Sequence, residues 1–339
     1  MATMTDVARM AGVSVSTVSY AMTGARPITA QTRQRVEYAM EQLGYTPNAL
    51  ARGLKSRRSH IVAVLFPTGG RGIDTSGMAY ILGASDFAQE HGYHVLLWTA
   101  NAGALDELRL LARQGLIDGA LLMEVRLADE RTDVLAQAGV EFGMIGHNGG
   151  DVASDFVDAD FDQCGRLAVT YLAELGHRHI VFVNQSRSFV AAGLGPSVRA
   201  RDAVVRAAKD AGIRLTVHNC ASSAAAGQRL FRDLVRRESD LTAMIALNEQ
   251  AVPGVMMAAQ QHGWRVPQDF SLVSLAMTPQ AALMTTPATT TVSPDANGMG
   301  RAAMAALIHR LDGGTGAATQ TLFPGQLIVR GTSARPRAT

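Results

Sequence analysis

The chain has few of the residues and motifs that support cofactor, metal or disulfide chemistry. Its 339 residues include two cysteines, Cys164 and Cys220, at no zinc-ligand spacing, and we expect no disulfide between them. There is no HExxH pair, no nucleophile elbow, and no glycine-rich loop followed by Lys-Ser or Lys-Thr. No apolar run approaches the length of a membrane span, and the first residues lack the apolar core of a secretion signal. We therefore expect a cytoplasmic protein that is not an enzyme, holds no metal or cofactor, and does not associate with membranes.

Positive charge is concentrated at one end of a near-neutral chain. Residues 1–60 contain eight Lys and Arg and three Asp and Glu, a net charge of +5, whereas the whole chain carries +2. Contact with nucleic-acid phosphates requires such a local excess of cations, although a solvated basic surface has the same composition. With 47% apolar residues, the rest of the chain can bury a sizeable core.

Residues 5–22, TDVARMAGVSVSTVSYAM, predict two short helices joined by a tight turn. Their apolar residues recur at the three- and four-residue intervals of helices that pack against each other. Gly12 stands where the first helix must end, often in a left-handed backbone, and Ser14 can cap the second helix. A helix-turn-helix of this kind places its second helix in the major groove of DNA. Similar helix pairs occur in many other domains, and the basic charge around this one favours DNA binding.

A third helix and a basic segment complete this region. Thr29 can cap a helix over residues 31–43, so that three helices close a small headpiece. In the segment that follows, Asn48 can cap a helix over residues 49–55 that is too short to be stable alone in water. Leu54 has two interpretations: a wedge between base steps in the minor groove, or a side chain packed against the headpiece.

The remaining residues predict a different architecture. From Ile61 onward, short apolar runs alternate with helical patterns of 10 to 15 residues; the runs are IVAVLF, HVLLW, GALLM, EFGMIG, HIVFVN, LTVHN, AMIAL and DFSLVSL. This alternation is typical of buried parallel strands in βαβ units. Eight or more strands exceed one small sheet, so we expect two doubly wound lobes with a ligand cleft at the carboxyl ends of the strands.

These stretches together resemble the lactose/galactose-repressor (LacI/GalR) family. The headpiece carries MTDVARMAGVSVSTVSYAMTG and ITAQTRQRVEYAMEQLGYTPNALARGLKSRRS, and the core carries YLAELGHRHIVFV and NEQAVPGVMMAAQQHGWRVPQDFSLVSL, so the resemblance covers essentially the full chain. It implies an all-α helix-turn-helix headpiece followed by a periplasmic-binding-protein-like α/β core of two doubly wound parallel-sheet lobes. The implied divisions are a headpiece at 1–46, a hinge helix or linker at 47–60, and a core at 61–339, with one lobe at 61–161 plus 293–320 and the other at 162–290 plus 321–339.

The resemblance also implies which residues contact DNA. Val15, Ser16 and Tyr20 are the recognition-helix residues that face base edges, and Ala51 and Leu54 form the minor-groove lever. Many family members have an arginine where this chain has Tyr20, and a tyrosine cannot make the bidentate guanine contact of an arginine. The full predicted set is Thr5, Ser14, Val15, Ser16, Thr17, Ser19, Tyr20, Thr29, Arg33, Asn48, Ala51, Arg52, Leu54, Lys55, Arg57 and Arg58.

The expected effector site departs from the family pattern. The usual acidic positions fall on Gly146 and on Ala276 and its neighbour, and the usual arginine falls on Ala200, between Arg199 and Arg201. Each missing partner of a sugar hydroxyl costs about 1–3 kcal/mol, which argues against a standard pyranose pocket and for a different or less hydroxylated ligand. The candidates that remain, each of which also has an ordinary structural interpretation, are Asp74, His147, Arg199, Arg201 and Asn248.

The sequence therefore predicts a sequence-specific DNA-binding transcriptional regulator, most simply a homodimeric repressor. It would bind a near-palindromic double-stranded operator, with a small-molecule effector, a sugar or another metabolite, in the interlobe cleft. One alternative is a solute-binding, transport-type protein, which explains the lobes but not the basic headpiece. Another is a DNA-binding regulator that responds to no effector. A doubly wound enzyme would need a catalytic constellation, which we do not find in the sequence.

Overall fold

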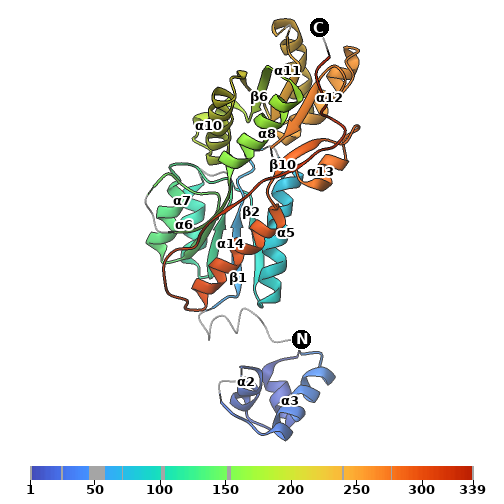
Figure 1. Ribbon diagram of the computed structural model, residues 1–339. Helices are drawn as coiled ribbons and strands as arrows, with labels where there is room; N and C mark the ends of the chain where they lie inside the picture. Colours follow the sequence, from blue (N-terminus) through green and yellow to red (C-terminus); the bar gives the residue numbers. More distant parts are fainter. Residues whose placement is uncertain are drawn as a thin grey trace. The chain divides into compact units, whose positions relative to one another are not determined.

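The computed structural model describes residues 2–23, 26–45, 58–70, 72–100, 104–150, 154–238, 240–275 and 277–337. The chain divides into two compact units, residues 1–59 and 60–339, which are described separately (Figure 1). The predicted hinge residues Asn48, Ala51, Arg52, Leu54, Lys55 and Arg57 lie outside the described residues, as does Ala276.

The first unit is a three-helix headpiece around a small apolar core. Its helices are α1 (Met4–Ala11), α2 (Val15–Thr23) and α3 (Ala30–Gln42). Val7, Val18 and Val36, one from each helix, are completely buried and meet at the centre of this core. The predicted third helix is therefore present, and its apolar face closes the headpiece.

The second unit consists of two lobes, each built on a six-stranded sheet with helices on both faces. The first lobe has the strand order β11-β5-β4-β3-β1-β2, and the second has β12-β10-β9-β8-β6-β7. All strand pairs are parallel except β10 with β12. The predicted two-lobed α/β architecture is thus confirmed (Figure 1).

In the first lobe, α5 and α14 pack on one face of the sheet and α6 and α7 on the other. Its elements are β1 (Ile61–Leu65), α5 (Thr75–Glu90), β2 (His94–Trp98), α6 (Leu105–Arg113), β3 (Gly119–Leu122), α7 (Glu130–Ala138), β4 (Glu141–Ile145), β5 (Asp155–Ala159), α14 (Ala296–Leu311) and β11 (Gln320–Phe323).

In the second lobe, α11 and α12 pack on one face of the sheet and α8 and α10 on the other. Its elements are α8 (Phe161–Leu175), β6 (His179–Asn184), α9 (Arg187–Ala191), α10 (Gly195–Asp210), β7 (Arg214–Asn219), α11 (Ala224–Arg237), β8 (Ala243–Ala246), the 3-10 helix η1 (Glu249–Ala251), α12 (Val252–Gln261), β9 (Ser271–Ser274), α13 (Pro279–Leu283), β10 (Thr290–Ser293) and β12 (Gln326–Ile328).

The chain crosses between the lobes three times: after β5, after β10 and after β11. Strand β11, at 320–323, pairs in parallel with β5 of the first lobe, so the third crossing follows Phe323. Residue 321, the predicted start of the final second-lobe segment, therefore lies within a strand of the first lobe. The apolar pattern also predicts no strand at β5, β10 or β11, because acids or hydroxyl residues interrupt it there.

Helices α5 and α14 approach each other so closely that glycine is needed at their crossing. A Cβ on Gly83 would lie 2.1 Å from the carbonyl oxygen of Asn297, and a Cβ on Gly300 would lie 2.1 Å from that of Tyr80. Neither backbone can yield without moving a whole helix off the sheet.

We therefore expect Gly83→Ala to lower the free energy of unfolding by about 2–3 kcal/mol, because the overpacked helices must separate. Urea unfolding of the full chain measures this loss. Gly143→Ala is the control, since its Cβ would meet nothing closer than 3.7 Å. Equal stability of the two variants would show that the helix crossing is not tightly packed.

Candidate DNA-binding and effector sites

The turn between α1 and α2 is held by backbone and side-chain contacts. Thr3 and Asp6 form a reciprocal capping box at the start of α1, and Gly12 ends the helix with φ 64°. The Ser14 hydroxyl accepts a hydrogen bond from the backbone N–H of Thr17 at 3.1 Å, as predicted for the cap of the second helix. The guanidinium of Arg35 on α3 donates to the carbonyl oxygens of Ala11 and Gly12, the latter at 3.0 Å. These bonds fix the turn between α1 and α2 against α3.

Several residues of α2 present side chains that DNA could reach. Val15 is 43% exposed and Ser16 is exposed, whereas Tyr20 is half-buried. The Arg26 guanidinium lies 5.5 Å from the centre of the Tyr20 ring, which brings a cation to this part of the helix. Ser19, by contrast, is only 6% exposed, so its side chain offers little surface to a ligand.

Three of the other predicted DNA contacts also have structural roles. Thr17 is half-buried, with its hydroxyl 2.8 Å from that of Ser14. Thr29 caps α3 by accepting from the N–H of Thr32, and Arg33 donates to the carbonyl of Ala21. Thr5 on α1 is exposed, as is Arg58 at the start of the described segment after the hinge.

A cavity of about 120 Å³ lies between the lobes of the second unit, at the carboxyl ends of the strands. Its polar lining includes four carboxylic acids, one from each of the loop before α5, the loop after β3, strand β5 and η1: Asp74, Glu124, Asp158 and Glu249. Phe66, Tyr80 and Phe161 supply aromatic walls. The cleft predicted from the fold class is therefore present and is rich in carboxylates.

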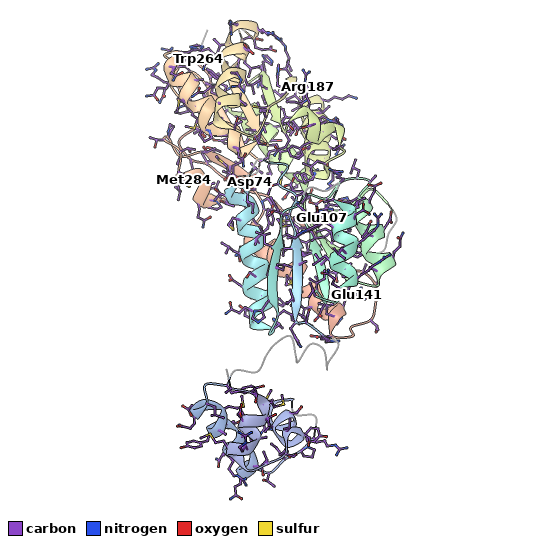
Figure 2. The ribbon with its side chains drawn as sticks, turned by 180° about the vertical axis from the view of Figure 1, so that it is seen from behind. Asp74, Glu107, Glu141, Arg187, Trp264 and Met284 are labelled. Atoms are coloured by element: carbon purple, nitrogen blue, oxygen red, sulfur yellow. The ribbon has the colours of Figure 1, made fainter. Side chains whose placement is uncertain are left out.

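Asp74 and Glu249 come from different lobes and meet at the start of α5. Asp74 caps this helix by accepting from the N–H of Gly77 at 2.7 Å, where the first lobe faces the second (Figure 2). Glu249, 8% exposed, accepts a hydrogen bond from the hydroxyl of Ser76. The Ser76 hydroxyl in turn accepts from the N–H of Thr278 of the second lobe at 3.3 Å. Burial raises the pKa of Glu249 to about 7, and the negative charge of Asp74 contributes to the increase.

Asp158 joins two of the predicted effector residues. One of its carboxylate oxygens lies 2.8 Å from Nδ1 of His147 and 2.8 Å from a terminal nitrogen of Arg199. Arg199 also donates to the backbone carbonyl of His147 at 3.1 Å. Burial lowers the pKa of Arg199, and the charge of Asp158 opposes that decrease. Gly146, where the family pattern has an acid, is part of the cavity lining. Asp158 on the neighbouring strand β5 provides a carboxylate at this part of the cavity.

Of the five predicted effector residues, only Asp74 belongs to the cavity lining. His147 and Arg199 contact the lining residue Asp158, whereas the last two have other partners. Arg201 on α10 donates from Nε to Asp202 at 2.8 Å. The Asn248 amide, 1% exposed, donates to the carbonyl of Cys220 at 2.7 Å and holds the β8–η1 turn. Three acids of the lining were not predicted from the sequence: Glu124, Asp158 and Glu249. Glu249 directly follows Asn248, so only the turn at η1 decides which of the two side chains faces the cavity.

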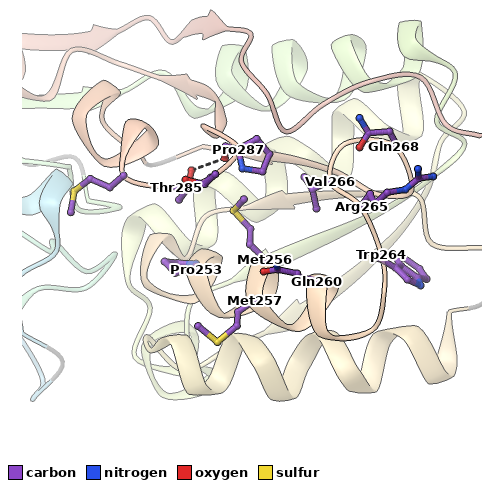
Figure 3. Close-up of a pocket in the computed structure, with 12 residues that line it drawn as sticks. Pro253, Met256, Met257, Gln260, Trp264, Arg265, Val266, Gln268, Thr285 and Pro287 are labelled. Carbon is purple, nitrogen blue, oxygen red and sulfur yellow. Dashed lines mark hydrogen bonds between the residues drawn. The ribbon is translucent and has the colours of Figure 1, made fainter.

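A larger groove of about 730 Å³ lies on the surface of the second lobe, next to α12 (Figure 3). Its lining includes Met256, Met257, Trp264 and Pro287. The charged residue in this lining, Arg265, is bound to Asp269 at 3.1 Å. The groove contains none of the predicted effector residues, and its lining residues all belong to the second lobe, so we favour the interlobe cavity as the effector site.

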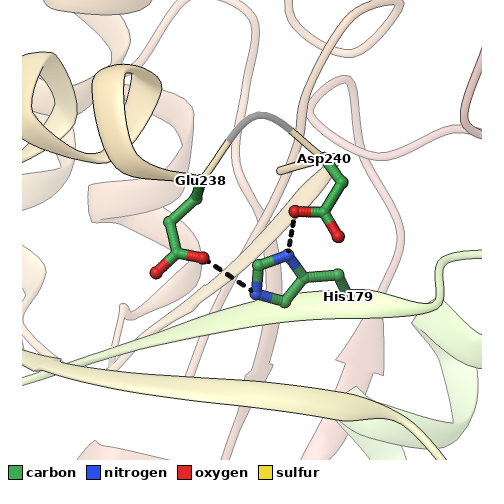
Figure 4. Close-up of side chains that lie close together, drawn as sticks. All are labelled: His179, Glu238 and Asp240. Atoms are coloured by element: carbon green, nitrogen blue, oxygen red, sulfur yellow. Dashed lines mark hydrogen bonds and ion pairs between the residues drawn. The ribbon is translucent and has the colours of Figure 1, made fainter.

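His179 lies between two carboxylates near the amino ends of β6 and β7 (Figure 4). Its Nδ1 is 3.1 Å from Asp240 and its Nε2 is 3.6 Å from Glu238. These are possible metal ligands, but the two ring nitrogens face different acids. Arg214 already reaches both carboxylates, at 2.8 Å and 3.4 Å. The guanidinium therefore serves as the cation of this cluster, and we assign it no metal.

A helix-turn-helix headpiece followed by a two-lobed, periplasmic-binding-protein-like unit defines a class of DNA-binding proteins with a ligand module. Comparison with known proteins agrees with this class. Residues 3–48 match the family described as bacterial regulatory proteins, lacI family, and residues 169–333 match the periplasmic binding protein-like domain.

Relatives match almost the whole chain. The HTH-type transcriptional regulator CelR of Thermobifida fusca is 28% identical over 335 residues, 97% of each chain. A solved transcriptional regulator CelR–cellobiose complex has a TM-score of 0.73 at 25% identity, over 98% of this chain and all of that one. The Lac repressor dimer bound to operator and the anti-inducer ONPF has a TM-score of 0.84 at 22% identity, over 98% of this chain and 99% of that one, and shows the shared fold.

The chain belongs to the lacI family of bacterial regulatory proteins. It is a DNA-binding transcriptional regulator and not an enzyme, as the sequence predicted. Within the described part of the chain, no helix has the length and apolar character needed to span a bilayer.

Proposed function

We propose that this protein is a cytoplasmic, homodimeric repressor whose affinity for a near-palindromic operator is set by a small organic effector in the interlobe cavity. The observation that carries the proposal is the combination of a helix-turn-helix headpiece with a cavity whose polar groups come from both lobes. Because Asp74 belongs to the first lobe and Glu249 to the second, a ligand that contacts both changes the relative stability of lobe arrangements.

The coupling follows from differential binding. An effector that prefers one lobe arrangement shifts the population towards it, and DNA affinity changes by the difference in binding energy, typically about 1–3 kcal/mol. The same linkage allows an inducer, which weakens the DNA complex, or a corepressor, which strengthens it. A solute-binding transport protein would explain the lobes but gives no role to the headpiece.

A homodimer is supported by exposed apolar side chains on adjacent elements of the second unit. On α5, Met78 and Leu82 are 39% and 51% exposed, and at the end of α13, Leu283 and the capping residue Met284 are 68% and 81% exposed. Two copies that cover this surface would remove it from water and hold two hinge segments at a fixed separation.

The experiment that tests the proposal is selection of DNA from a random duplex pool by the full-length protein at moderate salt. We expect the selected fragments to share a near-palindromic site with two half-sites. A regulator that responds to no effector would select the same site, but its affinity for that DNA would be the same in the presence of every ligand screened. A pool that stays random after several rounds would contradict sequence-specific binding.

Leu54 provides a sharper test of the predicted hinge contact. As a wedge in the minor groove, Leu54→Ala should weaken binding to the selected site by about 2–4 kcal/mol, because the kinked duplex loses its apolar support. Affinity for random duplex should stay within twofold. Fluorescence anisotropy with both duplexes measures the two effects, and Leu110→Ala, an exposed leucine of α6, is the control. Equal losses on both duplexes would contradict the wedge.

A further inference from the structure

The charges around the interlobe cavity point to the chemical class of its ligand. Four carboxylic acids line the cavity, and its described lining includes no Lys, Arg or His. Arg199 neutralises Asp158 from outside the lining. Among the described residues, no cation forms an ion pair with Asp74 or Glu249. The space between these two acids is therefore a region of negative potential that favours positive charge.

The amino end of α5 is already occupied by the protein's own carboxylates. A helix amino end usually binds anions, because its unpaired N–H groups and its dipole favour negative charge. Here Asp74 accepts from the N–H of Gly77, and Glu249 accepts from Ser76. A phosphate or carboxylate on the ligand would have to displace these groups and would meet their repulsion.

The size and walls of the cavity suit a small ligand with an apolar body. Its volume of about 120 Å³ is close to that of cavities that hold benzene, whereas a hexose would require the lobes to separate. Phe66 is buried in the core of the first lobe, and Tyr80 and Phe161 are partly buried against that core, so aromatic side chains line the cavity together with the acids. Carboxylates and aromatic faces together are the surroundings that an organic cation prefers.

We propose that the interlobe cavity binds a small organic amine, whose protonated nitrogen lies between Asp74 of the first lobe and Glu249 of the second. This inference names the ligand class of the effector site and so rests on the proposed function. The ammonium group supplies the positive charge that no described residue gives these two carboxylates, and it adds donors to those of Gly77 and Ser76. The aromatic walls cover its carbon skeleton. By joining one acid from each lobe, the amine stabilises the closed cleft.

The raised pKa of Glu249 gives this proposal a pH signature. Burial raises that pKa to about 7, so below pH 7 the carboxyl group holds a proton that an ammonium ion must displace. Affinity for an amine should therefore increase with pH and level off above pH 7, by about 30-fold between pH 5.5 and 8. The other ionisable groups that line the cavity are Asp74, Tyr80, Glu124 and Asp158. His147 and Arg199 both contact Asp158, so His147→Gln is measured in parallel.

The ligand class is tested with molecules of equal shape and different charge. Thermal shift and isothermal titration calorimetry on the full-length chain compare benzylamine, benzyl alcohol and benzoate, and then putrescine, 1,4-butanediol and succinate. We expect the amine of at least one series to bind at least tenfold more tightly than its neutral and anionic counterparts. Tighter binding of a neutral or anionic member, or no binding of either amine at millimolar concentration, overturns the proposal.

Two variants locate the bound amine. Glu249→Gln keeps the shape of the side chain and an acceptor for Ser76, but it should weaken amine binding at least tenfold at pH 8 and abolish the pH dependence. Asp74→Asn should also weaken amine binding. Glu107→Gln, an exposed acid on α6 of the same lobe, is the matched control (Figure 2). Unchanged affinity in both cavity variants overturns the assignment.

These outcomes are separate from the test of DNA binding. If the selected operator binds but amines do not, the protein remains a regulator and its ligand class is wrong. If the full chain binds an amine but prefers no duplex, the proposed function fails while the ligand assignment stands.

Discussion

Replacing Arg131 with alanine is expected to lower the free energy of unfolding of the full chain by about 3–5 kcal/mol, because it leaves Asp129 charged and buried without its partner. Both side chains are 2% exposed, and two nitrogens of the guanidinium lie 2.8 Å and 2.6 Å from the two carboxylate oxygens. Arg131 also donates to the carbonyl of Met123 at 3.0 Å, which ties α7 to the end of β3. Urea unfolding at pH 7 measures the loss.

The pH dependence of the loss identifies its cause. Burial alone would raise the pKa of Asp129, but the hydrogen bonds and charge of Arg131 hold it below its usual value. In the native protein this ion pair therefore contributes stability above the ordinary pKa of an aspartate, and the contribution is lost as the pH falls through the lowered value. Arg131→Ala should accordingly cost less at acidic pH than at pH 7.

A double variant provides the control. Asp129→Asn combined with Arg131→Met removes both charges, and asparagine can still cap α7. The double variant should recover most of the stability, because paired buried charges contribute little net energy relative to uncharged side chains. A single variant as stable as the native protein would show that Asp129 is solvated or otherwise paired.

Removal of residues 1–59 is expected to abolish specific DNA binding. Specific sites are typically bound about 10³-fold or more tightly than random duplex, and this difference requires base contacts that belong here to the headpiece. Electrophoretic mobility shift with the selected operator measures the loss. The apolar cores of both lobes lie entirely within residues 60–339, so the truncated chain should retain cooperative unfolding.

The control for the truncation is ligand binding by the same fragment. A fragment that unfolds cooperatively and binds the amine of the screen, yet fails to shift the operator, locates DNA recognition in the headpiece. Retention of operator specificity by the fragment would contradict that assignment and would require a second DNA-binding surface on the lobes.

The headpiece could be predicted in detail because its determinants are local. Gly12, Ser14 and Thr29 act on backbone groups within four residues, so their spacing in the sequence fixes the two helix ends and the turn. The role of Arg35 could not be read in this way, because its acceptors lie 23 and 24 residues earlier in the chain.

The strands could be predicted from the sequence only where their apolar runs are continuous. Strand β10, TTVS, is buried at all four positions although three of its residues carry hydroxyls. Two of these hydroxyls have distant partners: the Thr290 hydroxyl lies 2.8 Å from that of Ser333, and the Thr291 hydroxyl accepts a hydrogen bond from the guanidinium of Arg330 at 2.9 Å. Such burial depends on tertiary contacts that a local pattern does not contain.

For the effector cavity, the sequence predicts the position but few of the residues. Asp74 lines the cavity as predicted. His147 and Arg199 contact the lining residue Asp158, whereas Asn248 and Arg201 bond to other residues. The family pattern placed an acid on Gly146, and the structure supplies one from Asp158 on the adjacent strand. These two positions are neighbours because of the register between β4 and β5, which cannot be read from the sequence.

The most direct test of the account is the ratio of two dissociation constants, for the selected palindrome and for a scrambled duplex of the same composition. Both are measured with the full-length protein at about 150 mM salt, where phosphate contacts alone give weak binding. We predict a ratio of about 10³ or more. A ratio near one, with or without the amine, would contradict the conclusion that this chain recognises an operator.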